Sequence, residues 1–223
     1  MTTKIPVLIK KDLVSECRSR QVWPVTLQLG VLVAVLFSLQ IELPGDQQRR
    51  IAGPLLWFAI LFASLPTLER SFAAEREDRC LDGLLLSPVT PAAVYLAKLA
   101  VNLIVLLILT ALLIPLWTAL LGVPLLASPA AVALVALLAS LGMAAVGTLL
   151  SALVAGLGPR SGGLALLVLP LVLPVLLAAS EATRLILEDD LGPEWWRWML
   201  FLASFAVVFI VAGASLFEFA VCD

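Results

Sequence analysis

Six long apolar stretches alternate with short polar segments along the chain. They lie near residues 22–41, 51–68, 92–122, 129–155, 162–180 and 195–217. About 20 helical residues cross the hydrocarbon of a bilayer, so each stretch has the length of a membrane span. The third and fourth stretches are longer than a span needs, which predicts tilting or projection into water. The pattern predicts an all-α membrane protein with six transmembrane helices.

The segment before the first span has a different pattern. Apolar residues recur there at helical spacing with basic residues between them, which is typical of an amphipathic helix lying on a membrane surface. We therefore divide the chain into an interfacial helix over residues 1–21 and a six-span domain over residues 22–223. A solvated, frayed tail is the alternative for the first segment. The residues expected to form the interfacial helix include Lys4, Leu8, Lys11 and Leu13.

Small and kinking residues interrupt the later spans. Gly147, Ser151 and Ala155 place small side chains on one face of the fourth span, where another helix can approach closely. Pro170 and Pro174 lie inside the fifth span and predict a kink. These features suit either a moving, oligomeric bundle or ordinary membrane packing. We also expect residues 181–191 to form a short amphipathic helix or a capped loop at the outer surface.

Composition supports the membrane assignment. Of 223 residues, 62% are hydrophobic and only 13% are charged, which is too few charges to cover a water-facing surface. The net charge of −2 gives no field that favours nucleic acid. The sequence contains no histidine, so the usual general base, metal ligand and haem ligand are all missing. Three isolated cysteines without a CxxC motif argue against a zinc site.

The basic residues predict the orientation. Ten of the 14 Lys and Arg residues fall on the side that holds both termini, which indicates cytoplasmic termini. Tryptophans then gather at the outer interface as an aromatic belt, with Trp23 alone at the inner one. The belt is expected to contain Trp57, Trp117, Trp195, Trp196 and Trp198. The three cysteines fall on the reducing side, so no disulfide is expected.

The sequence offers no energy source and no catalytic constellation. Ionisable residues are not found at mid-membrane depth, where a proton pump needs them; Lys98 lies near the inner end of its span. Polar residues within the spans, such as Gln28, Gln40, Asn102 and Thr110, are interpreted mainly as helix–helix hydrogen-bonding groups. No lysine follows glycine, so a P-loop is absent from the sequence. We expect a protein that is not an enzyme and that draws energy from a partner.

One cytoplasmic loop is densely charged with both signs. Eight charges fall within 14 residues between the second and third spans, and Glu75 lies four residues before Arg79 in the favourable order for a helical ion pair. We expect residues 66–82 to continue the second span as a helix into the cytoplasm. The leucines at 81, 84, 85 and 86 then offer a knob for the groove of a soluble partner. A solvated loop with leucines folded onto the membrane is an equal alternative.

This region resembles the signature of a known family. Residues 72–98 read FAAEREDRCLDGLLLSPVTPAAVYLAK, which looks like the signature of the CcmB family, the haem exporter protein B permeases of bacterial cytochrome c maturation. More distantly the chain resembles ABC-2 exporter permeases. The basic N-terminal segment with Lys11-Asp12-Leu13, the Glu69-Arg70 pair and the six-span layout extend the similarity over most of the chain. Arg79-Cys80 departs from the smaller or less charged pair expected there.

The resemblance implies an ABC-2 exporter-like permease subunit in the inner membrane of a bacterium, coupled to a separate CcmA-type ATPase. Its other implied partners are a CcmC-type haem-handling protein, a CcmD-type small subunit, a CcmE-type haem chaperone and a second copy of the chain. The coupling loop near 69–91 would dock on the ATPase. Carried over by position, the ATPase-coupling residues are Glu69, Arg70, Glu75, Arg76, Glu77, Asp78, Leu81, Asp82 and Pro88.

The resemblance implies haem as the cargo of the complex, with no cofactor held by this chain and ATP bound by the partner. Without histidine the chain lacks the usual axial ligand. We therefore favour ATP-driven remodelling that releases the haem-loaded chaperone, with direct haem translocation as the rival mechanism. The segment Trp195-Trp196-Arg197-Trp198 is interpreted as an outer belt or a partner contact. Two other functions stay open, an ABC-2 exporter of a lipid or drug and a non-transporting membrane scaffold.

Overall fold

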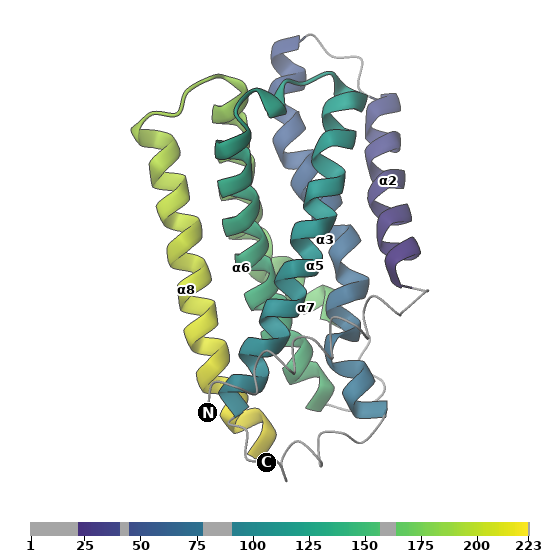
Figure 1. Cartoon of the computed structure of the whole chain (residues 1–223), viewed down its shortest axis with the longest axis vertical. Coiled ribbons are helices and arrows are strands. Elements are labelled where there is room, and N and C mark those ends of the chain that lie inside the picture. The colour runs from purple at the N-terminus through teal and green to yellow at the C-terminus, as the bar shows by residue number, and fades with distance from the viewer. Residues whose placement is uncertain (1–21, 41–44, 78–90, 157–163, 223) are drawn as a thin grey trace.

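The computed structural model describes residues 22–40, 45–77, 91–156 and 164–222, with side chains over 26–36, 47–68, 92–153 and 167–216. Within these ranges the chain is helical and contains no strand. Long helices stand side by side as a bundle (Figure 1). The elements are α2 (Val22–Gln40), α3 (Gly45–Glu77), α5 (Pro91–Leu121), the 3₁₀ turn η2 (Leu125–Ala127), α6 (Pro129–Gly156), α7 (Leu164–Leu187) and α8 (Pro193–Cys222).

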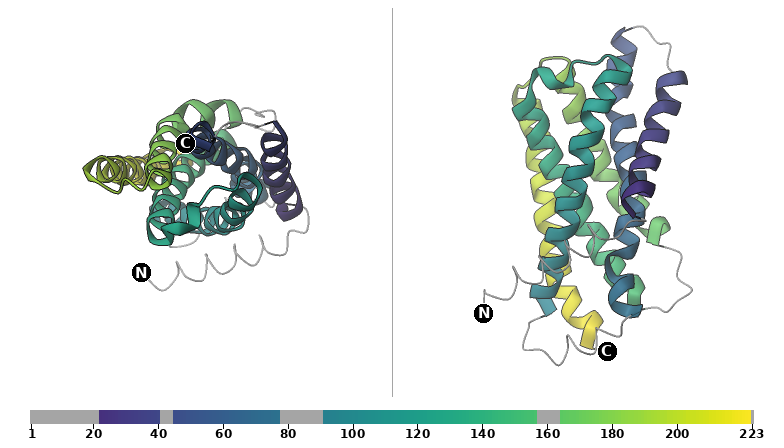
Figure 2. Two further views of the ribbon diagram at one scale, coloured as in Figure 1. Left: turned by 90° about the horizontal axis from the view of Figure 1, so that it is seen from above. Right: turned by 45° about the vertical axis from the view of Figure 1, so that its right-hand side comes forward.

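The helices alternate in direction, so the bundle has two distinct ends. We call one the Gly45 end, where α3 begins, and the other the Glu77 end, where α3 ends and α5 begins (Figure 1). Helices α2 and α8 lie at opposite sides of the bundle when it is viewed along its axis (Figure 2). Of the candidate spans in the described part of the chain, α8 is the least buried.

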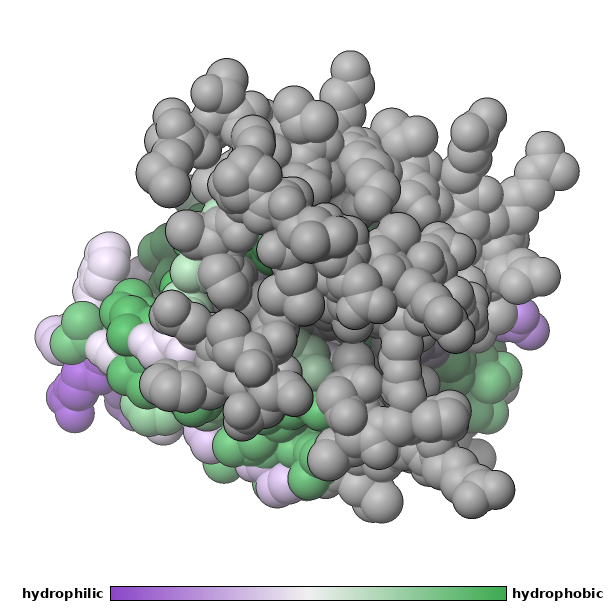
Figure 3. All heavy atoms as spheres, turned by 90° about the horizontal axis from the view of Figure 1, so that it is seen from below, coloured by the Kyte–Doolittle hydropathy of each residue, from purple (hydrophilic) through white to green (hydrophobic). Residues whose placement is uncertain are grey.

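Five of the described helices are long and apolar enough to cross a membrane. They cover Gln47–Leu68, Ala92–Leu121, Pro129–Leu153, Leu167–Leu187 and Pro193–Leu216, and the shorter apolar stretch Thr26–Leu36 belongs to α2. Figure 3 shows the Glu77 end from below, and hydrophobic residues predominate among the described atoms that are visible around its rim. The prediction of an all-α, multi-span membrane protein is confirmed.

Two helix boundaries differ from the sequence-based expectation. Helix α3 begins at Gly45, several residues before the expected start at 51. Helix α7 continues to Leu187 instead of ending near 180, so residues 181–187 are its last turns and not a separate amphipathic helix. The extension is stabilised by Arg184, which donates to Glu181 Oε2 at 2.8 Å and to Glu188 Oε2 at 2.6 Å.

Two of the tryptophans expected in the belt lie in the core instead. Trp57 is 1% exposed and Trp117 is 0% exposed. The Trp57 Nε1–H donates to Thr183 Oγ1 of α7 at 2.9 Å, and the Trp117 Nε1–H donates to the carbonyl oxygen of Ala52 in α3 at 3.1 Å. Each acceptor replaces the water that the bilayer does not offer to a buried indole. These residues therefore join helices and do not face lipid.

Two of the four polar residues noted within the spans form the expected hydrogen bonds between helices. The Asn102 Nδ2–H donates to Thr148 Oγ1 of α6 at 2.8 Å. Thr110 donates to the carbonyl oxygen of Leu106 at 2.7 Å, and its hydroxyl lies 3.4 Å from the Ser140 hydroxyl. The interpretation as helix–helix hydrogen-bonding groups is confirmed for Asn102 and Thr110. Gln28 is exposed, and the Gln40 side chain lies outside the described residues.

The close approach of α3 to α7 at Gly53 generates a stability prediction. A Cβ atom on Gly53 would lie 2.8 Å from the Ser180 carbonyl oxygen, which is backbone and has no rotamer to change. Gly53→Ala should therefore destabilise the bundle by about 1–3 kcal/mol, measured as the unfolding midpoint in detergent. Gly30→Ala is the matched control, because its Cβ would meet the flexible Leu113 side chain at 3.0 Å. Equal losses for the two variants would contradict this packing.

Candidate functional site

Helix α3 carries the candidate coupling residues without a break beyond its membrane span. The apolar stretch of α3 is followed at once by Glu69 and Arg70, and the helix continues to Glu77. At 1.5 Å per residue, these extra turns project about 13 Å along the helix axis. The expected continuation of the second span into the charged segment is confirmed as far as Glu77. Five of the candidate coupling residues are therefore on this helix, namely Glu69, Arg70, Glu75, Arg76 and Glu77.

The remaining candidate residues are not placed. Asp78, Leu81, Asp82 and Pro88 lie outside the described residues, as do Lys4, Leu8, Lys11 and Leu13 of the expected interfacial helix. Their roles stay predictions. The side chains of α3 beyond Leu68 are also outside the described set, so only the course of the helix supports the coupling site.

The base of the α3 extension contacts two neighbouring helices. Thr67 shares a hydrogen bond with Thr26 of α2, with the two hydroxyl oxygens 3.4 Å apart. Leu68 is fully buried and lies against Gly147 of α6, where an added Cβ would come within 2.6 Å of a leucine methyl carbon. The small-residue face predicted on the fourth span therefore receives α3, at Gly147.

Tyr95 fixes the start of α5 against α6 and α8. Its hydroxyl lies 3.2 Å from the carbonyl oxygen of Ala145 and 3.3 Å from that of Phe209, and it donates to these acceptors. Its ring lies directly over Gly213, where a Cβ atom would collide with the ring and the hydroxyl oxygen. The chain has a single tyrosine, and it is fully buried at this junction.

Sequence reasoning missed Tyr95 and the burial of Lys98. Both lie in the stretch that carries the family resemblance, but a lone tyrosine in an apolar helix does not reveal its partner carbonyls. Lys98 is only 7% exposed. It lies three residues after Tyr95 and four before Asn102, and this spacing places all three on the same side of α5. The spacing of these three polar residues on one face of an otherwise apolar helix was the feature of the sequence that could have indicated their burial.

The tryptophan-rich start of α8 lies at the Gly45 end of the bundle. Trp195 is 4% exposed and its ring contacts Trp196 edge-on at 5.1 Å, whereas Trp196 is 60% exposed and Trp198 is half-buried. The expectation of a lipid-facing belt is therefore wrong for Trp195, whose indole packs into the core. Trp196 fits such a belt, and Trp198 fits it in part.

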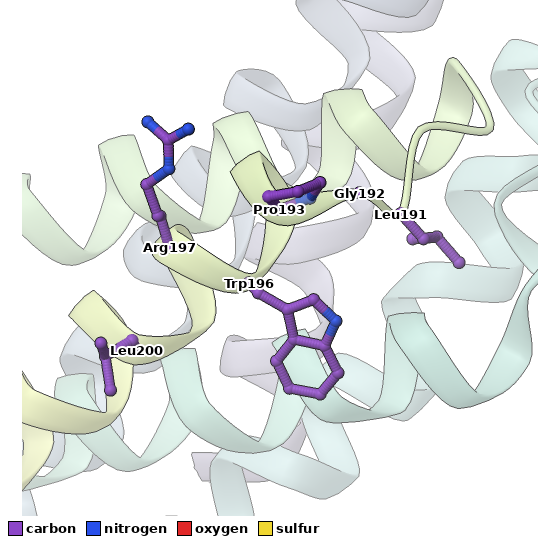
Figure 4. A pocket seen from close by; sticks show the side chains of 6 residues that line it. All are labelled: Leu191, Gly192, Pro193, Trp196, Arg197 and Leu200. Carbon is purple, nitrogen blue, oxygen red and sulfur yellow. The ribbon is translucent and has the colours of Figure 1, made fainter.

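A shallow groove of about 580 Å³ opens beside Trp196. It is lined by Leu191, Gly192, Pro193, Trp196, Arg197 and Leu200. The Trp196 indole and the Arg197 guanidinium point in opposite directions from the first turns of α8 (Figure 4). The groove is mainly apolar and does not bring reactive groups together. Among the described residues, no cluster of His, Cys, Asp and Glu could hold a metal ion.

The whole chain matches a known family. The sequence model described as CcmB protein matches residues 3–222. This chain belongs to the CcmB family. The match includes every described helix, so the architecture above is that of a CcmB protein, and the resemblance seen in residues 72–98 is confirmed.

Curated CcmB relatives align over most of their length. Heme exporter protein B of Rhodobacter capsulatus is 33% identical over 181 residues, covering 79% of this chain and 81% of the relative. That of Pseudomonas aeruginosa is 31% identical over 178 residues, covering 79% and 78%. That of Paracoccus denitrificans is 32% identical over 199 residues, covering 88% of each.

Proposed function

We propose that this CcmB-family chain is the permease subunit of an ABC transporter complex for c-type cytochrome biogenesis. The observation that carries the proposal is the family match over residues 3–222, together with relatives named Heme exporter protein B. The chain itself hydrolyses nothing in this proposal. It couples ATP hydrolysis on a separate CcmA-type ATPase to haem delivery or to release of the haem-loaded chaperone.

The course of α3 supports a coupling role for the charged segment. A membrane span and its charged extension form one continuous helix from Gly45 to Glu77. A helix transmits a push along its axis, whereas a flexible loop would absorb it. The ATPase then contacts the residues from Glu69 to Pro88, and its closure moves α3. The coupling residues are those named from the resemblance.

The charge distribution supports a cytoplasmic Glu77 end. The alternating helices place the end of α3, the start of α5 and the end of α8 together (Figure 1). That end adjoins the segments that carry ten of the 14 Lys and Arg residues. The protein accordingly lies in the bacterial inner membrane with both termini in the cytoplasm, where a soluble ATPase can reach α3.

The complex contains further membrane partners and a second copy of this chain. Two ATPase domains facing two permease subunits require a homodimer. A CcmC-type protein, a CcmD-type small subunit and a CcmE-type chaperone handle haem, because this sequence has no histidine to serve as an axial ligand. Export of a lipid or drug is less well supported, since the matched relatives are named for heme.

Reversing two charges at the end of α3 tests the coupling role. Glu75→Lys with Glu77→Lys should reduce co-purification of the ATPase by about tenfold or more, because inverting two charges removes the charge complementarity on which a docking contact depends. The measurement is the ratio of ATPase to permease recovered from detergent-solubilised membranes of a co-expressing strain. It also separates a transporter subunit from a scaffold that binds no ATPase.

The matched control reverses two acids at the opposite end. Asp190→Lys with Glu194→Lys changes the net charge equally but at the Gly45 end, and should leave the ratio unchanged. Membrane insertion should be the same for both double variants. If the ATPase co-purifies equally with the Glu75 and Glu77 variant and the wild type, the charged end of α3 is not the coupling surface.

A haem measurement separates the mechanical role from translocation through the spans. The purified chain, expressed alone with ample haem, should show no Soret absorbance above background, because it lacks the usual axial ligand. The complex that contains the haem-handling partners is the positive control and should show the band. A stoichiometric Soret band on the chain alone would contradict the mechanical role and support direct haem translocation.

A further inference from the structure

The groove beside Trp196, which we call the α8 groove, lies on the most exposed of the candidate spans. Only 22% of the most apolar part of α8 is buried inside the bundle, against 50–61% for the other four. The lining residues that belong to α8 are Pro193, Trp196, Arg197 and Leu200, which recur at i, i+3, i+4 and i+7. This spacing places them on one face of the helix, so the groove runs along α8 from its first turn.

The walls of the α8 groove are held in place by contacts within the chain. In the turn between α7 and α8, the Asp190 N–H donates to the carbonyl oxygen of Leu185 at 2.9 Å. An Asp190 carboxylate oxygen accepts from the Gly192 N–H at 3.1 Å. The Trp196 ring stands edge-on against the buried ring of Trp195, with the two centroids 5.1 Å apart. The groove is therefore formed before a ligand binds, and binding needs to order little of the chain.

Two side chains of opposite charge stand at the rim of the α8 groove. Arg197 lines the groove and Glu194 precedes it by three residues, so the two are exposed neighbours on the helix surface. Neither forms an ion pair in the described part of the chain, whereas Arg184 of α7 pairs with Glu181 and Glu188. The rim therefore offers one positive and one negative group side by side, which matches a ligand that carries one charge of each sign.

Further along α8, the same face is apolar. Leu200, Val207 and Val211 continue the stripe that begins at Trp196, and each of them is more than half exposed. A molecule lying on this face would meet charges of both signs at the first turns of α8 and then hydrocarbon toward the middle of the span. A phospholipid has the same order, because its charged headgroup lies at the surface of the bilayer and its acyl chains lie inside.

We propose that the α8 groove binds one phospholipid of the adjoining leaflet, whose headgroup carries a phosphate and a primary ammonium. Arg197 donates to the phosphate, Glu194 accepts from the ammonium, and an acyl chain lies against Trp196 and Leu200. A quaternary ammonium has no N–H to donate to Glu194, and a headgroup without a cation leaves that carboxylate unpaired beside a phosphate. The site goes beyond the proposed function and does not depend on it.

Quenching of Trp196 fluorescence by brominated lipids tests the site. The purified full-length chain is reconstituted into phosphatidylcholine vesicles that contain a minor fraction of one brominated lipid. The three probes are phosphatidylethanolamine, phosphatidylcholine and phosphatidylglycerol, each brominated near the glycerol end of its acyl chains, where a bound chain would contact Trp196. The chain has six tryptophans, so the Trp196 signal is obtained as the difference between the wild type and Trp196→Phe.

Brominated phosphatidylethanolamine should quench the Trp196 signal as though it were enriched about threefold or more over each of the other two lipids, which is the scale of two exposed ion pairs. Equal quenching by all three lipids would overturn the proposal, because an aromatic belt without a binding site gives that result. A preference for either of the other lipids would overturn it too. The absence of quenching by any lipid would show that protein, a partner helix or a second copy, covers the groove, and would also overturn it.

Neutral variants at the rim show whether Glu194 and Arg197 select the headgroup. Glu194→Gln and Arg197→Gln should each reduce the preference for phosphatidylethanolamine by about half or more, because each removes one of the two ion pairs. Arg49→Gln is the matched control, because Arg49 is exposed at the same end of the bundle, on α3, and does not line the groove. A preference that survives both rim variants, or that the Arg49 variant reduces equally, would overturn the proposal.

Discussion

Because the bilayer supplies no water, polar groups buried among membrane helices pair within the protein, on their own helix or on another, and Trp195 Nε1 is the exception among the described residues. In this protein the indole N–H groups of Trp57 and Trp117 and the side-chain amide of Gln48 meet that constraint at one end of α3. Their acceptors lie on α7 and α3 and at the last residue of α5. These three bonds fix α3 relative to α5 and α7 and so set the arrangement of the bundle at the Gly45 end.

At the level of Thr67 and Leu68, α3 packs through a hydroxyl pair and an apolar contact. Thr67 pairs with Thr26 of α2, and the fully buried Leu68 lies over Gly147 of α6 within the main core cluster. Beyond them the helix continues into the charged segment that a soluble ATPase would hold. Under the proposed function, closure of that ATPase moves this subunit through α3. One continuous helix that runs from the core into the charged segment suits that task.

The helices and the course of α3 into the charged segment were predictable from sequence, and most lateral contacts were not. The length of an apolar stretch predicts a helix without any knowledge of the helices that pack against it. The six apolar stretches and the continuation of α3 to Glu77 therefore followed from the pattern. Trp57 and Trp117 were expected at the surface because a tryptophan near the end of a span suits either an interface or a core. Only the position of Thr183 and of the Ala52 carbonyl decides between them. Helix α7 was predicted too short because its last turns mix charged and apolar residues, and the Glu181–Arg184–Glu188 pairing that stabilises them is not visible in hydropathy.

The orientation of the bundle is the central claim, because a cytosolic ATPase can reach α3 only if the Glu77 end faces the cytoplasm. Single cysteines at Glu77 and at Asp189, in a chain whose native cysteines are replaced by serine, lie at opposite ends of the bundle. Intact cells with a permeabilised outer membrane are treated with a membrane-impermeant maleimide. The account predicts labelling at residue 189 in intact cells, and labelling at residue 77 only after the inner membrane is opened. Labelling of residue 77 in intact cells, with residue 189 protected, would contradict it.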